Sequence, residues 1–427
     1  MRLLLPVDRF SPHDRAVALT MWGVGVVQGF GQAHPSVTLP FTRAGLGLSP
    51  AEMSAVLAVA RLASLAALIF AFVGDRRGRR RPLLAAYVLI LAGNGAAAAS
   101  SNPAGFTISQ SLVRIATSAI SALGVVWLAE HLSPRVRAYG ISIYGAAGSF
   151  GAALALLGLP LAERDWRLPY LLTLLGLLLL PVLARRLSES PLLPVASPRT
   201  MRGDFANLGT EMTGSQFWVA GLAGLLASAF SAVGLAFSTE RLVGGLGLST
   251  GTAVMITLAG GTLGGLGFFL GGRLSDAWGR RPTTVLSLLM ILGGGLTLYQ
   301  AEAVPLLVGA IVVSSFGSFA YIPSAATHRA ELFPTSVRAS MASALAWLGT
   351  LGSALGLAVG RLTIDTMGLA GTMTLLGTGM VAAVALTLAL PETRARHLDA
   401  GAGAAPPIDK DYSPPGDQGG SGPPHPG

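Results

Sequence analysis

The sequence has no cysteine and few charged residues. Without cysteine the chain can form no disulfide, can use no thiol nucleophile and can hold no cysteine-bound metal. Charged residues make up 11% of the 427 residues, against about 25% in a typical soluble domain, whereas 52% are hydrophobic. This imbalance excludes an ordinary soluble protein. The net charge of +9 is not carried by a polar domain, so we expect no nucleic-acid partner.

Acidic residues are absent from the long apolar segments, since every Asp and Glu falls in a polar connection, a tail or a segment end. No nucleophile–base set and no cluster of metal ligands is visible. The glycine-rich run 260–265 lies inside an apolar segment, where it favours close helix packing over phosphate binding. We therefore expect no enzyme activity, no cofactor and no metal site.

The hydrophobic residues form runs of about 20, the length that a helix needs to cross a ~30 Å hydrocarbon layer. Such segments must be helical, because lipid offers the backbone of a lone strand no hydrogen-bond partner. The sequence thus predicts an all-α membrane protein with twelve transmembrane helices. We place them at 16–38, 53–73, 83–100, 105–129, 138–160, 167–184, 216–238, 250–271, 283–301, 304–327, 339–361 and 368–390. The second should begin with a capping box at 49–52.

Several landmarks recur along the chain and indicate two copies of one unit. The pairs that lie 201 residues apart are Asp75 with Asp276, Gly78 with Gly279, and Glu130 with Glu331. An interval of this length is typical of a domain rather than of a solenoid repeat. We predict two pseudo-symmetric six-helix bundles at 16–184 and 216–390. The remaining parts are a cytoplasmic N-terminus (1–15), a cytoplasmic linker (185–215) and a disordered cytoplasmic tail (391–427).

The distribution of arginine predicts the orientation. Lys and Arg are concentrated in the termini and in the connections after even-numbered spans. The other connections hold only Arg43, Arg164, Arg167, Arg241 and Arg361. Because cytoplasmic loops carry the positive excess, both termini should face the cytoplasm, in a multi-pass protein of the cytoplasmic membrane.

Several motifs resemble those of a known family. Asp-x-x-Gly-Arg-Arg follows the second and the eighth predicted spans, at 75–80 and 276–281. Trp166-Arg167-Leu168-Pro169, Ser188-Glu189-Ser190-Pro191 and Pro391-Glu392-Thr393 are similar to segments of sugar porters and metabolite–proton symporters. With twelve spans in two sets of six, the chain resembles the major facilitator superfamily of secondary transporters over about residues 16–394. It departs from the family at Ala71 and Ala277, and it lacks the paired glutamines that sugar porters carry in the seventh span.

The resemblance implies a cytoplasmic gate. In that family the loop acids and arginines hold the two bundles together on the cytoplasmic side while the site faces outward. Charge-assisted hydrogen bonds of this kind stabilise one of the two conformations of an alternating-access transporter relative to the other. The matching gate residues are Asp75, Gly78, Arg79, Glu130, Arg137, Asp276, Gly279, Arg280, Glu331 and Arg338. The plainer alternative is that these arginines only set the topology.

Two arginines lie inside predicted spans. Arg61 and Arg114 are at similar depth, roughly 12 Å from the outer end of a span at ~1.5 Å per residue. A charge at the membrane centre costs about 2.5–3.5 kcal/mol on insertion scales, and no acid lies deep enough to pair with either. We interpret them as an anion-binding site in a water-filled cavity. One alternative is that both arginines are structural, with the Arg61 side chain snorkelling toward the outer face. The other is that they take part in coupling transport to an ion.

Further polar residues complete the candidate site. Gln28 and Gln32 are four residues apart and so share one helix face. In the resembling family the first, fourth, seventh and tenth spans line the cavity. This implies as lining residues Gln28, Gln32, Arg114, Gln216, Ser314 and Tyr321. For each, hydrogen bonding between helices is the alternative. His34 is a candidate for proton coupling, with an interfacial side chain as the plainer interpretation.

The sequence therefore predicts a secondary active transporter that moves a small organic anion or metabolite by alternating access, alone or with H⁺. The expected partners are membrane lipid and the small-molecule substrate, and we expect a monomer. An efflux pump for amphipathic drugs or natural products is the alternative within transport. A transporter-like membrane receptor or sensor is the alternative of another class.

Overall fold

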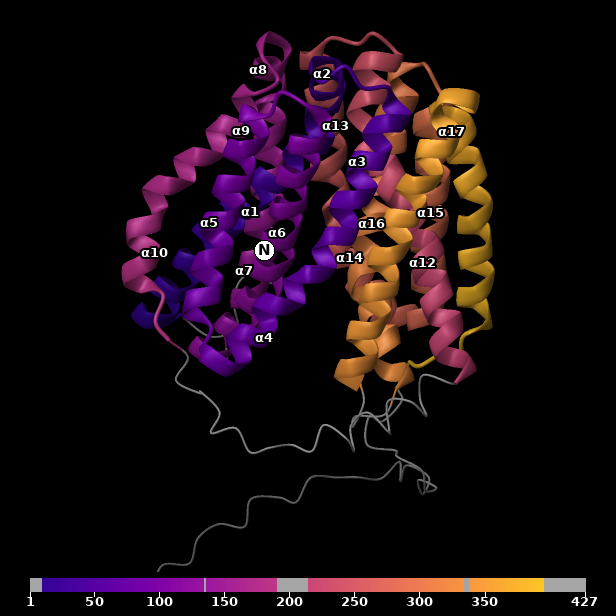
Figure 1. Cartoon of the computed structure of the whole chain (residues 1–427). Coiled ribbons are helices and arrows are strands. Elements are labelled where there is room, and N and C mark those ends of the chain that lie inside the picture. The colour runs from indigo at the N-terminus through magenta and orange to yellow at the C-terminus, as the bar shows by residue number, and fades with distance from the viewer. Residues whose placement is uncertain (1–9, 134–135, 190–213, 334–337, 395–427) are drawn as a thin grey trace, which may run out of the picture.

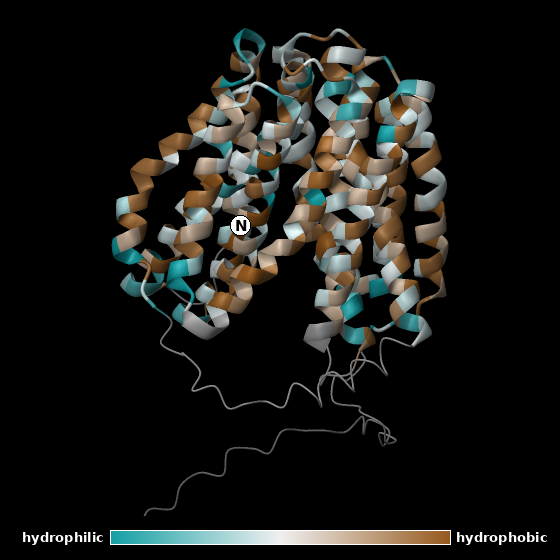
Figure 2. Cartoon of the chain, viewed as in Figure 1, coloured by the Kyte–Doolittle hydropathy of each residue, from teal (hydrophilic) through white to brown (hydrophobic). Residues whose placement is uncertain are grey.

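The computed structural model describes residues 10–133, 136–189, 214–333 and 338–394, and its regular elements are helices (Figure 1). The first nine residues, most of the predicted linker (190–213) and most of the predicted tail (395–427) lie outside the described residues. Figure 2 shows the middle of the helices to be mainly hydrophobic, with hydrophilic residues gathered toward the two ends. This pattern is that of helices that cross a membrane.

The helices fall into two groups along the chain. The first group is α1 (Pro12–Val37), α2 (Leu39–Gly45), α3 (Pro50–Ala63), η2 (Ser64–Ala67), α4 (Leu68–Arg77), α5 (Arg80–Ala99), α6 (Pro103–His131), α7 (Arg137–Leu157), α8 (Leu159–Arg164), α9 (Leu168–Leu172), η3 (Thr173–Leu179) and α10 (Leu180–Arg186). The second is α12 (Ser215–Ala236), η4 (Glu240–Gly245), α13 (Thr250–Gly264), α14 (Leu266–Trp278), α15 (Arg280–Gln300), α16 (Val304–Leu332) and α17 (Arg338–Ala389).

The described helices make up the predicted twelve spans. Ten helical segments are long and apolar enough to cross a membrane. The last of these, Met341–Ala389, contains two spans, because Gly368 has a φ of 70° and interrupts the helix. The more polar α1, which is 26 residues long, completes the set. The predicted all-α fold with two six-helix bundles is confirmed.

Several helices extend further than the hydrophobic pattern indicated. α4 ends at Arg77 and α14 at Trp278, because charged residues that suggested a loop belong to the last helical turn. Likewise α1 begins at Pro12 rather than at residue 16, since Ser11 and Asp14 form a capping box there. The capping box predicted for the second span is confirmed, with Ser49 and Glu52 each accepting from the other's backbone N–H.

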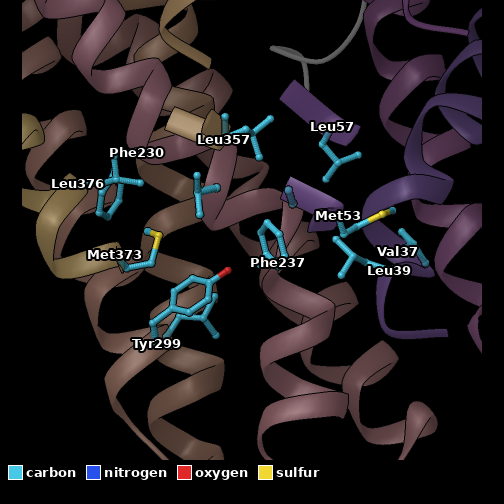
Figure 3. Close-up of a cluster of buried hydrophobic side chains, with 14 of the residues drawn as sticks. Val37, Leu39, Met53, Leu57, Phe230, Phe237, Tyr299, Leu357, Met373 and Leu376 are labelled. Carbon is cyan, nitrogen blue, oxygen red and sulfur yellow. The ribbon is translucent and has the colours of Figure 1, made fainter. Parts of the chain in front are cut away.

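The hydrophobic core shows where the two bundles meet. We call the helix ends around Arg79 and Arg280 the arginine-rich end, and the ends around α2, α8 and η4 the opposite end. At the opposite end one buried cluster takes side chains from both bundles, among them Leu39 and Met53 from the first and Phe237 from the second (Figure 3). The other two buried clusters each lie within one bundle. The bundles are therefore packed together at the opposite end.

Polar contacts between the bundles follow the same pattern. A salt bridge joins Arg43 Nη2 of α2 to Glu240 Oε1 of η4 at 2.6 Å. Ser54 donates to the carbonyl oxygen of Leu357 at 2.6 Å. Further bonds between the bundles run from Ser49 Oγ to Asp365 Oδ2 at 3.0 Å and from Thr250 Oγ1 to Glu163 Oε2 at 2.9 Å. All of these bonds lie toward the opposite end, where the cluster of Figure 3 is shared.

Candidate functional site

A cavity of about 580 Å³ lies between the bundles and contains both intramembrane arginines. It is lined by Gln32, Arg61, Ser64, Arg114, Thr117, Ser118, Ser121, Ala122, Val125, Thr350 and Ser353. Most of these residues come from the first bundle, and only Thr350 and Ser353 come from the second. The structure thus brings together three of the residues that the sequence predicted for the site, Arg61, Arg114 and Gln32.

One face of α6 forms the largest part of the wall. From Arg114 to Val125 each of its lining residues has another three or four positions away, so they lie on one side of the helix. The side chain of Arg61 reaches the same cavity from α3, and Ser64 follows it by one turn. This periodic placement makes the polar wall a continuous surface on two neighbouring helices.

The two guanidinium groups share the cavity without an acidic partner. They are close enough for their charges to interact, and the interaction is repulsive. Within the described part of the chain, the ion pairs all involve other arginines, at 43, 79, 167 and 280. A guanidinium group presents five N–H donors and no acceptor. The cavity is therefore electropositive and rich in hydrogen-bond donors for an anion.

Other predicted lining residues lie elsewhere. Gln28 is buried, donates to the Thr117 carbonyl oxygen at 3.2 Å and to Ser121 Oγ at 2.7 Å, and so joins α1 to α6. Gln216 is exposed in the first turn of α12, a helix with no residue in the cavity wall. Neither glutamine is among the residues that line the cavity in this conformation. A glutamine can equally join helices or meet solvent at a helix end.

The candidates on α16 and the histidine of α1 are also outside the cavity wall. The hydroxyl of Tyr321 accepts a hydrogen bond from Arg329, whose guanidinium lies 5.6 Å from the tyrosine ring centre. Ser314 donates to a carbonyl of its own helix at 3.3 Å. His34 is fully buried in the first bundle, with Nε2 3.1 Å from Thr173 Oγ1. Its packing is that of a core histidine, and it is not among the residues that line the cavity.

The predicted gate residues pair within bundles. Arg79 Nε donates to both carboxylate oxygens of Glu130 at 2.9 Å. In the second bundle Arg280 Nε lies 3.3 Å from Glu331 Oε2, and Arg280 also pairs with Asp276. In this arrangement these pairs do not join the two bundles. The side chains of three further gate candidates, Asp75, Arg137 and Arg338, lie outside those that the structure describes.

The glycine of each loop motif receives a carboxylate from a distant segment. Gly78 and Gly279 have φ angles of 91° and 122°, which favour glycine. A Cβ on Gly78 would lie 2.3 Å from Glu189 Oε1, and one on Gly279 would lie 2.7 Å from Glu392 Oε2. These two glutamates accept hydrogen bonds from the first backbone N–H groups of α5 and α15. They cap both helices, a role that was not predicted although both residues belong to motifs noted in the sequence.

We predict that the cap at Glu392 is lost in acid. Burial alone would raise the pKa of this carboxyl, but hydrogen bonds from backbone N–H groups outweigh burial and lower the pKa from 4.5. The stabilisation is therefore present above about pH 4.5 and is lost as the pH falls through the lowered pKa. Glu392→Gln should melt below the wild type at about pH 7 and together with it at about pH 3. Because Glu392 is exposed, we expect a difference of about 1 kcal/mol or less.

Glu302→Gln, an exposed carboxylate at the opposite end, provides the control and should leave the melting curve unchanged at both pH values. A gap between Glu392→Gln and the wild type that persists at low pH would show that the substitution acts through packing rather than through the charge.

The salt bridge between Arg43 and Glu240 is a feature that the sequence analysis missed. Its carboxylate is almost fully buried, with 5% of the side chain exposed, against 24% for the arginine. A signal was present in the repeated segment Gly-Leu-Gly-Leu-Ser at 45–49 and 245–249, because each charge lies a few residues before one copy. The repeat places both copies at the same end of the molecule, where opposite charges can meet.

Comparison with known proteins gives a consistent result. A family model described as Major Facilitator Superfamily matches residues 21–299 and 222–410. No curated protein matches the chain. Among solved structures, a D-xylose-proton symporter is 20% identical with a TM-score of 0.71, over 89% of this chain and 99% of that chain. The inward-open xylose transporter XylE from E. coli is 18% identical with a TM-score of 0.68, over 90% and 98%.

A bacterial homologue of the human lysosomal transporter Spinster, in an inward-facing and occupied conformation, is 15% identical with a TM-score of 0.71. The match covers 89% of this chain and 97% of that chain. At these identities the likeness is one of fold.

Proposed function

This chain belongs to the major facilitator superfamily of secondary transporters, and we propose that it moves a small organic anion across the cytoplasmic membrane by alternating access. The observation that carries the proposal is the pair Arg61 and Arg114, which line one cavity between the bundles with no acidic partner among the described residues. An intramembrane charge is costly and is by default functional.

The chemistry of a guanidinium group supports an anionic substrate. Its planar donors match a carboxylate or a phosphate, and the bonds are charge-assisted. Between the helices, where the local dielectric is lower than in bulk water, these bonds are stronger than on a protein surface. A substrate that brings the missing negative charge therefore gains most of its binding energy from Arg61 and Arg114.

The conformation supports a cytoplasm-facing state. Under the proposed topology the arginine-rich end faces the cytoplasm. The shared core and the salt bridge between Arg43 and Glu240 lie at the opposite end, which would face outward. Within the described residues, the contacts named above between the bundles lie at that outer end, so the site would exchange its substrate with the cytoplasm.

The composition of the cavity wall disfavours the efflux alternative. A pump for amphipathic cations needs apolar or aromatic surfaces, and a cation would be repelled by two arginines. The residues of the described chain that line the cavity include hydroxyl, amide and guanidinium groups, and their apolar members are Ala122 and Val125. The wall therefore fits a polar anion better than an amphiphile.

Uptake into proteoliposomes tests the proposal. We expect the purified full chain to move labelled pyruvate or labelled succinate well above protein-free vesicles, and to leave labelled xylose outside. Arg114→Gln should reduce anion uptake by about tenfold to a hundredfold, which is the loss expected for a hydrogen bond to a charged group. Repeating the assay with an imposed pH gradient separates proton symport from uniport.

Arg167→Gln is the matched control, because Arg167 forms an exposed ion pair within one bundle, 3.9 Å from Asp165. It should transport at the wild-type rate. Uptake of a cationic amphiphile such as tetraphenylphosphonium, with no uptake of either anion, would contradict the proposal and support efflux.

A further inference from the structure

The cavity offers two cations to one ligand. Arg61 and Arg114 line the same cavity and repel each other, so a ligand that brings negative charge removes an electrostatic cost. A monoanion neutralises one guanidinium and leaves the other uncompensated in a partly dry setting. A ligand with two negative charges removes the repulsion and gives both groups a partner.

Four of the six hydroxyl groups of the wall are oriented to accept rather than to donate. Each hydroxyl has one proton and two acceptor lone pairs. Four of the wall hydroxyls give that proton to a carbonyl oxygen of their own helix or turn, at 2.6 to 3.2 Å: Ser64, Thr117, Thr350 and Ser353. Their remaining lone pairs are available to a ligand that carries O–H groups. A ligand ammonium group could also donate to them, but the two arginines would repel it.

These two features define one ligand chemistry. We propose that the cavity binds a small dianion that carries hydroxyl groups, such as a hydroxylated dicarboxylate or a sugar phosphate. Arg61 and Arg114 hold its two charges, and the hydroxyl oxygens of the wall accept from its O–H groups. The inference rests on the proposed function as an anion transporter and adds the charge and the hydroxyl content of the substrate.

The two bundles have different shares in this site. Both charges belong to the first bundle, whereas the second contributes only the hydroxyls of Thr350 and Ser353, one turn apart on α17. The charge of the ligand is therefore recognised by the first bundle alone. The second bundle can contribute to specificity only through hydrogen bonds to the neutral part of the ligand.

A series of four-carbon compounds separates charge from hydroxyl content. Butyrate has one carboxylate, succinate has two, tartrate has two with two hydroxyls, and threitol has hydroxyls and no charge. Using titration calorimetry on the purified full chain, we expect succinate to bind at least about tenfold more tightly than butyrate, because a second charged hydrogen bond forms. Tartrate should bind more tightly than succinate by about fivefold or more, and threitol should show no heat of binding.

A second comparison measures the affinity for glycerol 1-phosphate and for tartrate by the same calorimetry. Tighter binding of one of the two assigns the dianion as a phosphate ester or as a dicarboxylate, and either result supports the proposal. Arg61→Gln and Arg114→Gln should each remove the preference for succinate over butyrate, because one cation then remains. Arg61→Lys and Arg114→Lys keep the charge and should keep the preference for the dianion, which shows that any loss in the Gln variants is not misfolding.

Arg167→Gln is again the control and should reproduce every wild-type affinity. Equal binding of butyrate and succinate by the wild type overturns the dianion while leaving the anion transporter intact. Equal binding of succinate and tartrate overturns the part played by the hydroxyls. Binding of none of the anions contradicts the proposed function itself.

Discussion

Gly151→Ala lowers the melting temperature of the purified protein, whereas Gly145→Ala on the same helix leaves it unchanged or raises it slightly. A Cβ on Gly151 would lie 2.1 Å from the carbonyl oxygen of Val26 and 2.8 Å from the backbone nitrogen of Phe30. Both contacts are backbone atoms of α1, which cannot rotate away as a side chain would. The two helices must separate, and overpacking of this kind costs about 1–3 kcal/mol, or more where the backbone cannot yield.

The matched control isolates this effect. Gly145 lies six residues before Gly151 on α7, and a Cβ there would meet no atom within 4 Å. Both substitutions gain the same helix propensity, about 1 kcal/mol in favour of alanine, so their difference reports the contact with α1. Thermal unfolding followed by circular dichroism in detergent measures both. Equal melting temperatures for the two variants would show that α1 and α7 are not in close backbone contact.

The same packing recurs in the second bundle, as the pseudo-symmetry requires. A Cβ on Gly352 of α17 would lie 2.1 Å from the carbonyl oxygen of Leu225 on α12. Gly352→Ala should therefore destabilise the protein to a similar degree. Small residues allow the backbones of the first and fifth spans of each half to approach closely, which is how helices associate where lipid removes the hydrophobic driving force.

The spans and the two halves could be predicted because their signals are strong and independent of packing. Bilayer thickness sets the length of each apolar run, and the repeat of Asp75 and Gly78 at Asp276 and Gly279 sets the symmetry. Helix ends were harder to predict. Charged residues such as Arg77 are as compatible with a last helical turn as with a loop, so the pattern placed the ends too early.

The candidate site could be predicted only in part, for a related reason. Arg61 and Arg114 stand out because a charge inside a span needs an explanation, and the structure places both in one cavity. Glutamine carries no such cost. Gln28 and Gln32 are one helical turn apart, yet Gln28 bonds to α6 while Gln32 lines the cavity. The face of α1 that meets the cavity is set by the packing of the neighbouring helices. It therefore cannot be predicted from the sequence of α1 alone.

The last prediction concerns the salt bridge between Arg43 and Glu240 at the opposite end. Arg43 and Glu240 are 197 residues apart in sequence and join the two bundles at the end where the core is shared. Breaking one partner of a buried pair leaves an uncompensated charge and costs about 3–5 kcal/mol in the state that contains the pair. A state in which the bundles separate at this end does not contain the pair and bears no such cost. Glu240→Gln should therefore shift the equilibrium toward that state.

Spin-label distances measure the shift. The chain has no cysteine, so Ser101→Cys and Ala303→Cys, both exposed at the opposite end and one in each bundle, would carry the only labels. We expect Glu240→Gln to increase the population with a long distance by about tenfold or more, since 1.4 kcal/mol already changes an equilibrium tenfold. Arg43→Gln should have the same effect. The double variant Arg43→Gln/Glu240→Gln should recover part of the short distance, because it leaves no unpaired charge.

The control is the exposed pair of Arg167 and Asp165, which lies within one bundle. Arg167→Gln should leave the distance distribution unchanged, because an exposed pair contributes little and is common to both states. An unchanged distribution in Glu240→Gln would mean that the apolar cluster of Figure 3 holds the opposite end closed without the salt bridge. Recovery in the double variant would instead assign the effect to the buried charge, since both variants remove the same bond and differ only in the charge that they leave behind.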